Sequence, residues 1–472
     1  MCTSREAIFL AMINFRGQLT RYTEGSVHEL WTISYPLILS MMSVNVMIFL
    51  DRLILAHYDT RAMNAAVVAW ITFSIFQFGT MGIAAISEVF VGQYNGAAKS
   101  KQMGEPVWQM IWFSVLTGFL FIPIGLFAGA YLIPNPDYMA DGIPFFKTLM
   151  LFGPTFPLVA ALSSFFVGRG QVKLVMSATI LSNLFNIVLD FVLIFGVDDL
   201  LPAMGAKGAA IATGVAQSLQ ALVLFGLFLQ KQYREKYATN CWRFKPSLFM
   251  HIFRVGLPAS LSYIFDAIAW SVLAQFLASV SEGHLTVYTI GDSFFVLFGF
   301  GFLGLQKGVT TVAANYIGAN REEILGATLR SGIKIILALM IVLMIPLFLF
   351  PDNLAQFFLK QDSVLVVNEE LKDMLHLAMA WLWVYFLLDG IAWLFSGILT
   401  AAGDTKYVML ISGVGPWIFS ILPTYFCVRY WEGSPIITWI ICAIYGLLNA
   451  LCFYLRYKTK RWDPKLALHI LR

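Results

Sequence analysis

The most unusual side chains in this sequence are two amides and a carboxylate inside an apolar segment. Asn183, Asn186 and Asp190 interrupt the stretch SNLFNIVLDFVLIFG at residues 182–196, which otherwise consists mainly of Leu, Ile, Val and Phe. Their spacing of three and four residues places all three side chains on one face of a helix. An ionisable group is costly to bury in a membrane helix, so these residues indicate a functional site.

Carboxylate and amide oxygens can serve ion transport in two ways. Burial favours the protonated form of a carboxyl group, so that it can exchange a proton near neutral pH. Alternatively, the oxygens can coordinate a hard cation such as Na⁺. Asp190 and Asn186, one helical turn apart, supply both kinds of oxygen, and the sequence does not distinguish H⁺ from Na⁺. It contains no HExxH, Walker A or potassium-filter sequence, so an ATP-driven pump or an intramembrane protease is unsupported.

Other apolar segments also contain ionisable residues, namely Asp51, Glu88, Asp266, Lys307 and Asp389. The depth of Asp266 and Asp389 within their segments favours a function over a structural hydrogen bond to a neighbouring helix. Glu88 lies near the end of its segment, where either a site residue or a boundary residue would fit. Lys307 could pair with a carboxylate and neutralise it, or line a transport pathway.

The composition predicts an all-α polytopic membrane protein rather than a soluble enzyme with a large core. Of the 472 residues, 59% are hydrophobic and 12% are charged, whereas soluble domains carry roughly 25% charged residues. A helix needs about 20 apolar residues to cross a bilayer. Twelve segments meet this requirement: 31–54, 65–91, 107–133, 145–167, 174–197, 207–230, 252–280, 284–311, 326–350, 371–398, 407–429 and 436–456.

The cysteines and the amino terminus add little chemistry. The five cysteines form no CxxC motif and no paired spacing, so we expect no zinc site, no disulfide framework and no cofactor. The first 26 residues lack a long uncharged stretch and a clear cleavage site, so they do not resemble a signal peptide. Residues 8–15 fit either a short interfacial helix or a poorly ordered tail.

The distribution of positive charge predicts the orientation of the chain in the membrane. The two tails and the even-numbered loops together hold 21 Lys and Arg residues, against seven on the other side. Because positively charged loops stay in the cytoplasm, we expect both termini to be cytoplasmic. An even number of spans agrees with this pattern.

The chain also repeats itself. GQYNGAAKSKQ at residue 92 matches ANYIGANREEI near residue 314 at an offset of 222, and the same offset relates Gly82 to Gly304. We therefore expect two pseudo-symmetric six-helix lobes, inserted with the same polarity and related by an axis along the membrane normal. The predicted division is an amino lobe at 1–230, a cytoplasmic linker at 231–250, a carboxy lobe at 251–458 and a cytoplasmic tail at 459–472.

Three sequence features occur together in this chain. They are a Pro early in the first and seventh spans, QYNGA and NYIGA after the second and eighth, and GRGQVKLVM followed by LSNLFNIVLDFVLIFG and MGAKGAAIAT. On these motifs the chain resembles the multidrug and toxic compound extrusion (MATE) family over nearly its whole length. The resemblance implies an antiporter that exports amphipathic, often cationic organic compounds in exchange for H⁺ or Na⁺.

The resemblance also implies two sets of site residues. In DinF-type members an amino-lobe cation site would consist of Asp51, Asn186 and Asp190. In NorM-type members a carboxy-lobe site would consist of Asp266 and Asp389, although the first of these is usually Glu. Glu88, Asn183 and Lys307 are candidates for the pathway. The sequence also departs from the family at Ile48, where Asn is common, and at residues 170–173, where GDTK reads GQVK.

We expect a monomer in a bacterial inner membrane that binds small organic compounds, contacts membrane lipids and binds no nucleic acid. One alternative is a flippase for a lipid-linked precursor, which would need several Arg or Lys side chains for phosphates, where the sequence offers Lys307. A second alternative is a channel or a sensory membrane protein, which would need neither the duplication nor carboxylates in both halves.

Overall fold

The computed structural model describes residues 19–197, 201–349 and 369–462. Within these ranges, twelve helical segments are long and apolar enough to cross a membrane, and each overlaps one of the predicted spans. The described residues contain no strand beyond an isolated bridge between Val197 and Leu201. The all-α, twelve-span prediction is therefore confirmed. The segment at 8–15, for which an interfacial helix was considered, lies outside the described residues, as does the tail from 463 onward.

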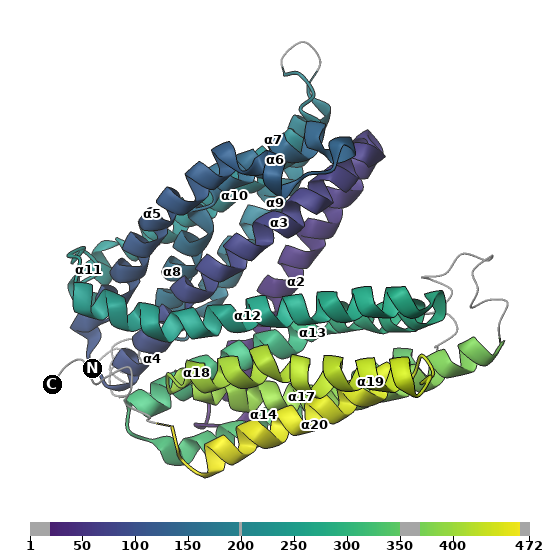
Figure 1. Cartoon of the computed structure of the whole chain (residues 1–472). Coiled ribbons are helices and arrows are strands. Elements are labelled where there is room, and N and C mark those ends of the chain that lie inside the picture. Colours follow the sequence, from purple (N-terminus) through teal and green to yellow (C-terminus); the bar gives the residue numbers. More distant parts are fainter. Residues whose placement is uncertain (1–18, 198–200, 350–368, 463–472) are drawn as a thin grey trace.

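The first six spans form one bundle, which we call the amino bundle (Figure 1). Two of these spans are broken: the second at Ile86, and the fourth at Gly153 and Pro154. The elements are α2 (Val27–Tyr58), α3 (Thr60–Ala85), α4 (Ser87–Gly96), η1 (Ser100–Gln102), α5 (Gly104–Phe127), α6 (Gly129–Leu132), α7 (Pro136–Phe152), α8 (Thr155–Val167), α9 (Val172–Phe195) and α10 (Gly205–Phe228).

The last six spans form the carboxy bundle. Its eleventh span contains two π-helical segments on either side of Pro416, since proline cannot donate the regular backbone hydrogen bond. The elements are α12 (Pro246–Val280), α13 (Glu282–Gly318), η2 (Glu322–Ile324), α14 (Leu325–Met344), η3 (Ile345–Leu349), α17 (Glu369–Ala401), α18 (Thr405–Val408), η4 (Met409–Val414), η5 (Trp417–Ile421), α19 (Leu422–Tyr430) and α20 (Ile437–Lys458). The bounds given above for the lobes, the linker and the tail stay a prediction.

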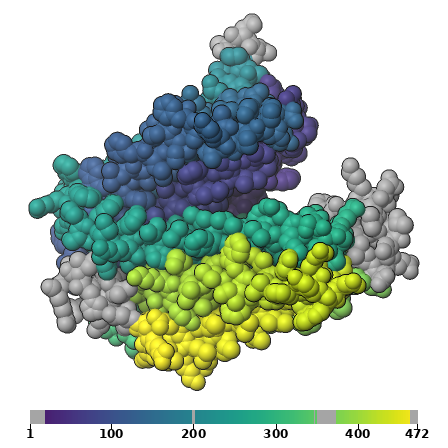
Figure 2. Space-filling view, in the orientation of Figure 1, coloured from purple at the N-terminus to yellow at the C-terminus, as the bar shows by residue number. Residues whose placement is uncertain are grey.

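The two bundles are arranged as a V (Figure 1). They meet at the end that carries α4 and α11 (Lys231–Tyr237), which we call the closed end. They diverge toward the end that carries α7 and α19, and the space-filling view shows these far ends standing apart (Figure 2).

The contacts between the bundles follow the sequence repeat. Helix α2 packs along α13, and α12 packs along α3. A Cβ atom at Gly82 would lie 3.0 Å from the Cα atom of Ser260, and a Cβ atom at Gly304 would lie 2.8 Å from the Cα atom of Ile38. Both contacts connect positions that the offset of 222 exchanges. The repeat in the sequence therefore corresponds to a pseudo-two-fold relationship between the bundles.

Polar side chains join the bundles at the closed end. Tyr316 Oη donates to both carboxylate oxygens of Glu29, at 2.8 and 3.0 Å, and both residues are buried. Similar hydrogen bonds connect Arg321 to Glu24, Asn95 to Asn315, and Gln93 to the carbonyl oxygen of Ala401. Opening this end would require all of these bonds to break.

The linker between the bundles is fixed to the amino bundle by an aromatic cage. The Arg169 guanidinium lies 3.9 Å from the ring centre of Tyr237, 4.6 Å from that of Phe165 and 5.0 Å from that of Tyr233. It also donates to Tyr237 Oη at 2.9 Å. Because both tyrosines belong to α11, these cation–π contacts hold the linker helix against the amino bundle.

The rest of the linker follows α5. Trp108 Nε1 donates to the carbonyl oxygen of Thr239 at 2.8 Å, and Trp112 Nε1 donates to that of Trp242 at 2.9 Å. The backbone N–H of Lys245 donates to Gln109 Oε1 at 2.8 Å. The linker is thus bonded to the amino bundle up to the residue before α12.

Candidate functional site

The residues predicted for the amino-lobe site come together between α2, α9 and α10. Asp51 lies late in α2, and Asn186 and Asp190 lie on the buried face of α9. When the amide group of Asn186 is oriented with its nitrogen toward Asp51, this nitrogen donates a hydrogen bond to Asp51 Oδ1 at 3.0 Å. The amide oxygen then accepts from the backbone N–H of Thr213 at 3.2 Å. Asn186 thereby links the carboxylate of α2 to the backbone of α10.

Asp190 neighbours Asp51 and is fully buried. The two carboxyl groups lie close enough to interact directly. Neither carboxylate oxygen of Asp190 accepts a hydrogen bond from the described residues. Two adjacent ionised carboxylates would repel each other, so this arrangement requires a proton or a cation between them. The pair therefore has the chemistry of a cation-exchange site.

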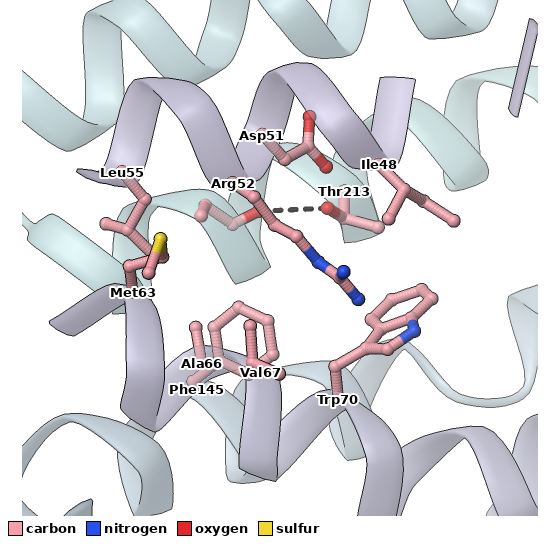
Figure 3. Close-up of a pocket in the computed structure, with 11 residues that line it drawn as sticks. Ile48, Asp51, Arg52, Leu55, Met63, Ala66, Val67, Trp70, Phe145 and Thr213 are labelled. Carbon is pink, nitrogen blue, oxygen red and sulfur yellow. Dashed lines mark hydrogen bonds between the residues drawn. The ribbon is translucent and has the colours of Figure 1, made fainter. Parts of the chain in front are cut away.

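A small cavity of about 40 Å³ opens beside Asp51 (Figure 3). Helices α2 and α3 supply most of its walls, and Figure 3 shows the Arg52 side chain reaching from α2 toward Trp70 of α3. Such a volume can hold a few water molecules or a hydrated cation, but not a drug-sized compound. Asp51 lines this cavity and Asp190 does not, so we expect an ion from the cavity to meet Asp51 first.

Asn183 lies one turn before Asn186 on α9, and its amide nitrogen donates to Ser43 Oγ of α2 at 2.8 Å. Asn183 therefore contacts the same helix as Asn186 but is not in hydrogen-bond contact with the two carboxyl groups. This hydrogen bond connects α2 to α9, and a role of Asn183 in the pathway stays a prediction.

In the carboxy bundle, Asp266 of α12 and Asp389 of α17 lie close enough to repel each other electrostatically. Trp270 Nε1 donates to Asp266 Oδ1 at 2.9 Å. Asn449 Nδ2 of α20 lies 3.3 Å from Asp389 Oδ1, and Asp389 is buried. The Trp270 ring lies 6.4 Å from that of Tyr385. The two predicted carboxylates therefore share one polar cluster with an aromatic border.

Glu88 and Lys307, the remaining pathway candidates, lie at the interface between the bundles. Glu88 of α4 is buried, and its Oε1 accepts from Thr311 Oγ1 of α13 at 2.6 Å. Lys307, one turn earlier on α13, attracts the same carboxylate electrostatically. Both candidates therefore lie at the interface that closes one end of the molecule.

Sequence reasoning missed several members of these clusters. Asn449 and Asp292 each interrupt an apolar span, so the rule that selected Asp190 could have found them. Asp292 lies near Tyr288 and Cys442 in the carboxy bundle. The backbone N–H of Thr213 had no sequence signal, because its role depends on how α10 packs against α9. Among the described residues, no group of three or more His, Cys, Asp or Glu side chains is arranged for a metal ion.

The model of the MatE family matches the chain twice, at residues 36–192 and 258–426. The chain belongs to the MATE family. It is therefore an integral multi-pass membrane protein and a transporter rather than an enzyme. The two matches fall in the two bundles, in agreement with the internal repeat.

Individual relatives extend this similarity. A probable multidrug resistance protein NorM of Thermotoga maritima is 23% identical over 426 residues, which cover 89% of each chain. The probable multidrug resistance protein YoeA of Bacillus subtilis is 25% identical over 346 residues, covering 72% of this chain and 73% of the relative.

Solved structures share the fold. A multidrug resistance MATE transporter of the MOP superfamily in an outward-facing conformation has a TM-score of 0.82 and 18% identity, over 94% of this chain and 97% of that one. A MATE transporter in complex with MaD3S has a TM-score of 0.83 and 19% identity, over 94% and 98% of the two chains. At these identities the likeness supports the fold alone.

Proposed function

We propose that this protein is a secondary antiporter of a bacterial inner membrane that exports amphipathic or cationic organic compounds in exchange for H⁺ or Na⁺. The observation that carries this proposal is the buried contact between Asp51 and Asp190, bordered by Asn186 and open to a small cavity. The multidrug resistance names of the NorM relatives support the substrate class.

The amino-bundle site would couple the ion to movement through α2. An entering proton or Na⁺ removes the repulsion between the carboxyl groups of Asp51 and Asp190, which belong to different helices. Helix α2 packs on α9 and also on α13 of the other bundle. A shift of α2 relative to α9 would therefore change the contact between the bundles, and with it the access of substrate to the space between them.

The carboxy-bundle cluster provides a second site for the same ion. Asp266 and Asp389 lie on α12 and α17, so neutralising their charges would remove a repulsion between these two carboxyl groups. We propose that Asp266 and Asp389 bind a coupling cation, with Asn449 and Trp270 as hydrogen-bond donors that hold them in place.

The orientation predicted from the basic loops makes the V an outward-facing state. The closed end carries α4, α11 and the basic linker, which the charge distribution assigns to the cytoplasm together with both termini. In this state the far ends of the bundles stand apart on the outer side, where an exporter would release its substrate.

The test is transport by the purified protein in liposomes. A fluorescent cationic dye is followed while a proton gradient or a sodium gradient is imposed separately, and we expect one of these gradients to drive the dye against its own concentration gradient. Saturable accumulation would exclude a channel. Absence of movement under both gradients, with correctly inserted protein, would contradict export of organic cations, and a lipid-headgroup exposure assay would then test the flippase.

A further inference from the structure

Glu88 is a buried carboxylate in the amino bundle whose partners belong to the carboxy bundle. It follows the break at Ile86, where α3 gives way to α4, and it is 8% exposed. Thr311 Oγ1 donates to Glu88 Oε1 at 2.6 Å, and Lys307 supplies the positive charge that acts on the carboxylate. The hydrogen bond between Thr311 and Glu88, with the Lys307 charge close by, therefore exists only while the closed end is closed.

The surrounding interface leaves little freedom for this contact. Next to Lys307, a Cβ atom at Gly308 would overlap the Ser34 side chain of α2. Gly168 packs equally closely on Glu88, since a Cβ atom added at Gly168 would lie 2.7 Å from the backbone carbonyl oxygen of Glu88. The Glu88 carboxylate is buried in this close packing, which strengthens its attraction to the Lys307 charge.

The pseudo-two-fold symmetry of the interface does not account for these charges. The offset of 222 maps Glu88 onto Thr310 and Lys307 onto Ala85. At the symmetry-equivalent position, formed by Thr310 and Ala85, the bundles meet without charged side chains. The charges of Glu88 and Lys307 therefore have no counterpart at the symmetric position, and burying the Glu88 carboxylate without a function would be costly.

The ring of Tyr263 lies within electrostatic range of both this contact and the carboxy-bundle cluster. Tyr263 of α12 is 49% exposed and lies near enough to interact with both Glu88 and Asp266. An exposed tyrosine beside a carboxylate is a suitable surface for an organic cation, because the ring face attracts positive charge.

We propose that Lys307 is a tethered counter-cation that the positively charged group of a transported compound replaces at Glu88. When the closed end opens, Glu88 separates from Lys307 and Thr311 and becomes the anionic partner of the compound, with Tyr263 beside it. When the end closes again, Lys307 returns to Glu88 and displaces the compound toward the open side. This inference rests on the proposed export of organic cations.

The charges of Glu88 and Lys307 could instead act only as a lock between the bundles, and the two roles predict different results. Equilibrium binding of tetraphenylphosphonium and of the uncharged triphenylphosphine oxide is measured by tryptophan fluorescence on the purified protein. We expect Glu88→Gln to weaken phosphonium binding about tenfold. We expect Lys307→Gln to strengthen it about tenfold, and the strengthening to vanish in the Glu88→Gln/Lys307→Gln double variant. Binding of the uncharged compound should not follow this pattern.

Thr311→Val is the matched control, because it removes a hydrogen bond across the same interface and leaves both charges in place. It should change the binding of the two compounds by the same factor. If Glu88→Gln and Lys307→Gln also change both bindings equally, the pair is only a lock and the inference is wrong. Tetraphenylphosphonium flux by the wild-type protein in liposomes tests export separately. Absence of flux would overturn the proposed function and this inference together. Normal flux, combined with variants that change the binding of both compounds equally, would overturn the inference alone.

Discussion

Gly96 and Gly318 occupy equivalent positions at the closed end, each against the backbone of the other bundle. A Cβ atom at Gly96 would overlap the carbonyl oxygen of Asn315, and one at Gly318 would overlap the carbonyl oxygen of Gln93. The same offset of 222 relates both the two glycines and the two carbonyl groups. The repeated sequences that contain these glycines therefore form the closing contact between the bundles.

The first prediction concerns this contact. Gly96→Ala should favour opening of the closed end, because the added methyl group cannot be accommodated while the backbones touch. Spin labels on Lys99 and Glu323, one on each bundle, should report a longer distance in the variant than in the wild type. Gly226→Ala, where the added Cβ would meet no atom within 4 Å, is the control and should leave the distance unchanged. An unchanged distance in Gly96→Ala would contradict the assignment of this contact as the closing contact between the bundles.

The second prediction concerns Asp190. Asp190→Asn should reduce ion-driven dye accumulation in liposomes at least about tenfold, because an amide cannot exchange a proton and binds a cation more weakly than a carboxylate does. Asp373→Asn, at an exposed position on α17, should transport normally. Normal accumulation with an intact ion dependence in Asp190→Asn would remove the amino-bundle site from the mechanism.

The third prediction concerns Asn449, a residue that sequence reasoning missed. Asn449→Leu removes the amide that donates to Asp389 Oδ1 and should raise the cation concentration needed for half-maximal transport by about three- to tenfold. Leu451→Met, two residues away on the exposed face of α20, should leave this concentration unchanged. An unaltered cation dependence in Asn449→Leu would show that the carboxy-bundle cluster does not bind the coupling ion.

The fourth prediction concerns the aromatic cage of the linker. Arg169→Leu removes the cation that Tyr233 and Tyr237 enclose and should weaken the docking of α11 by about 1–2 kcal/mol. Limited trypsin digestion should then cut faster at Lys231, Arg234 and Lys236. Arg429→Leu, at an exposed site outside the cage, serves as the comparison and should digest at the wild-type rate. Equal rates in the two variants would mean that the cage does not fix the linker.

The sequence predicted the features that depend on local pattern. Apolar length located the spans, and the spacing of Asn186 and Asp190 placed them on one buried face of α9. Their approach to Asp51 was implied only by the family resemblance, because it depends on how α2 crosses α9. The break at Ile86 had no adjacent proline or glycine to mark it, so no local sequence pattern predicted it.

The charged residues Glu88 and Lys307 mark the limit of this reasoning. In the sequence they are 219 positions apart in different halves of the chain, and two readings fitted each of them. Their proximity becomes visible only when α4 is placed against α13. Contacts across a pseudo-symmetric interface depend on both halves at once, and no window of sequence contains them.

The linker has a mechanical consequence for any rocking motion. Since the linker is hydrogen-bonded to α5 up to Lys245, it would move with the amino bundle and would not act as a flexible segment between the two bundles. The covalent joint is then confined to the step from Lys245 to Pro246, where the backbone enters α12 directly. Any movement of the carboxy bundle relative to the amino bundle would therefore bend the backbone at this joint, directly before Pro246 at the start of α12.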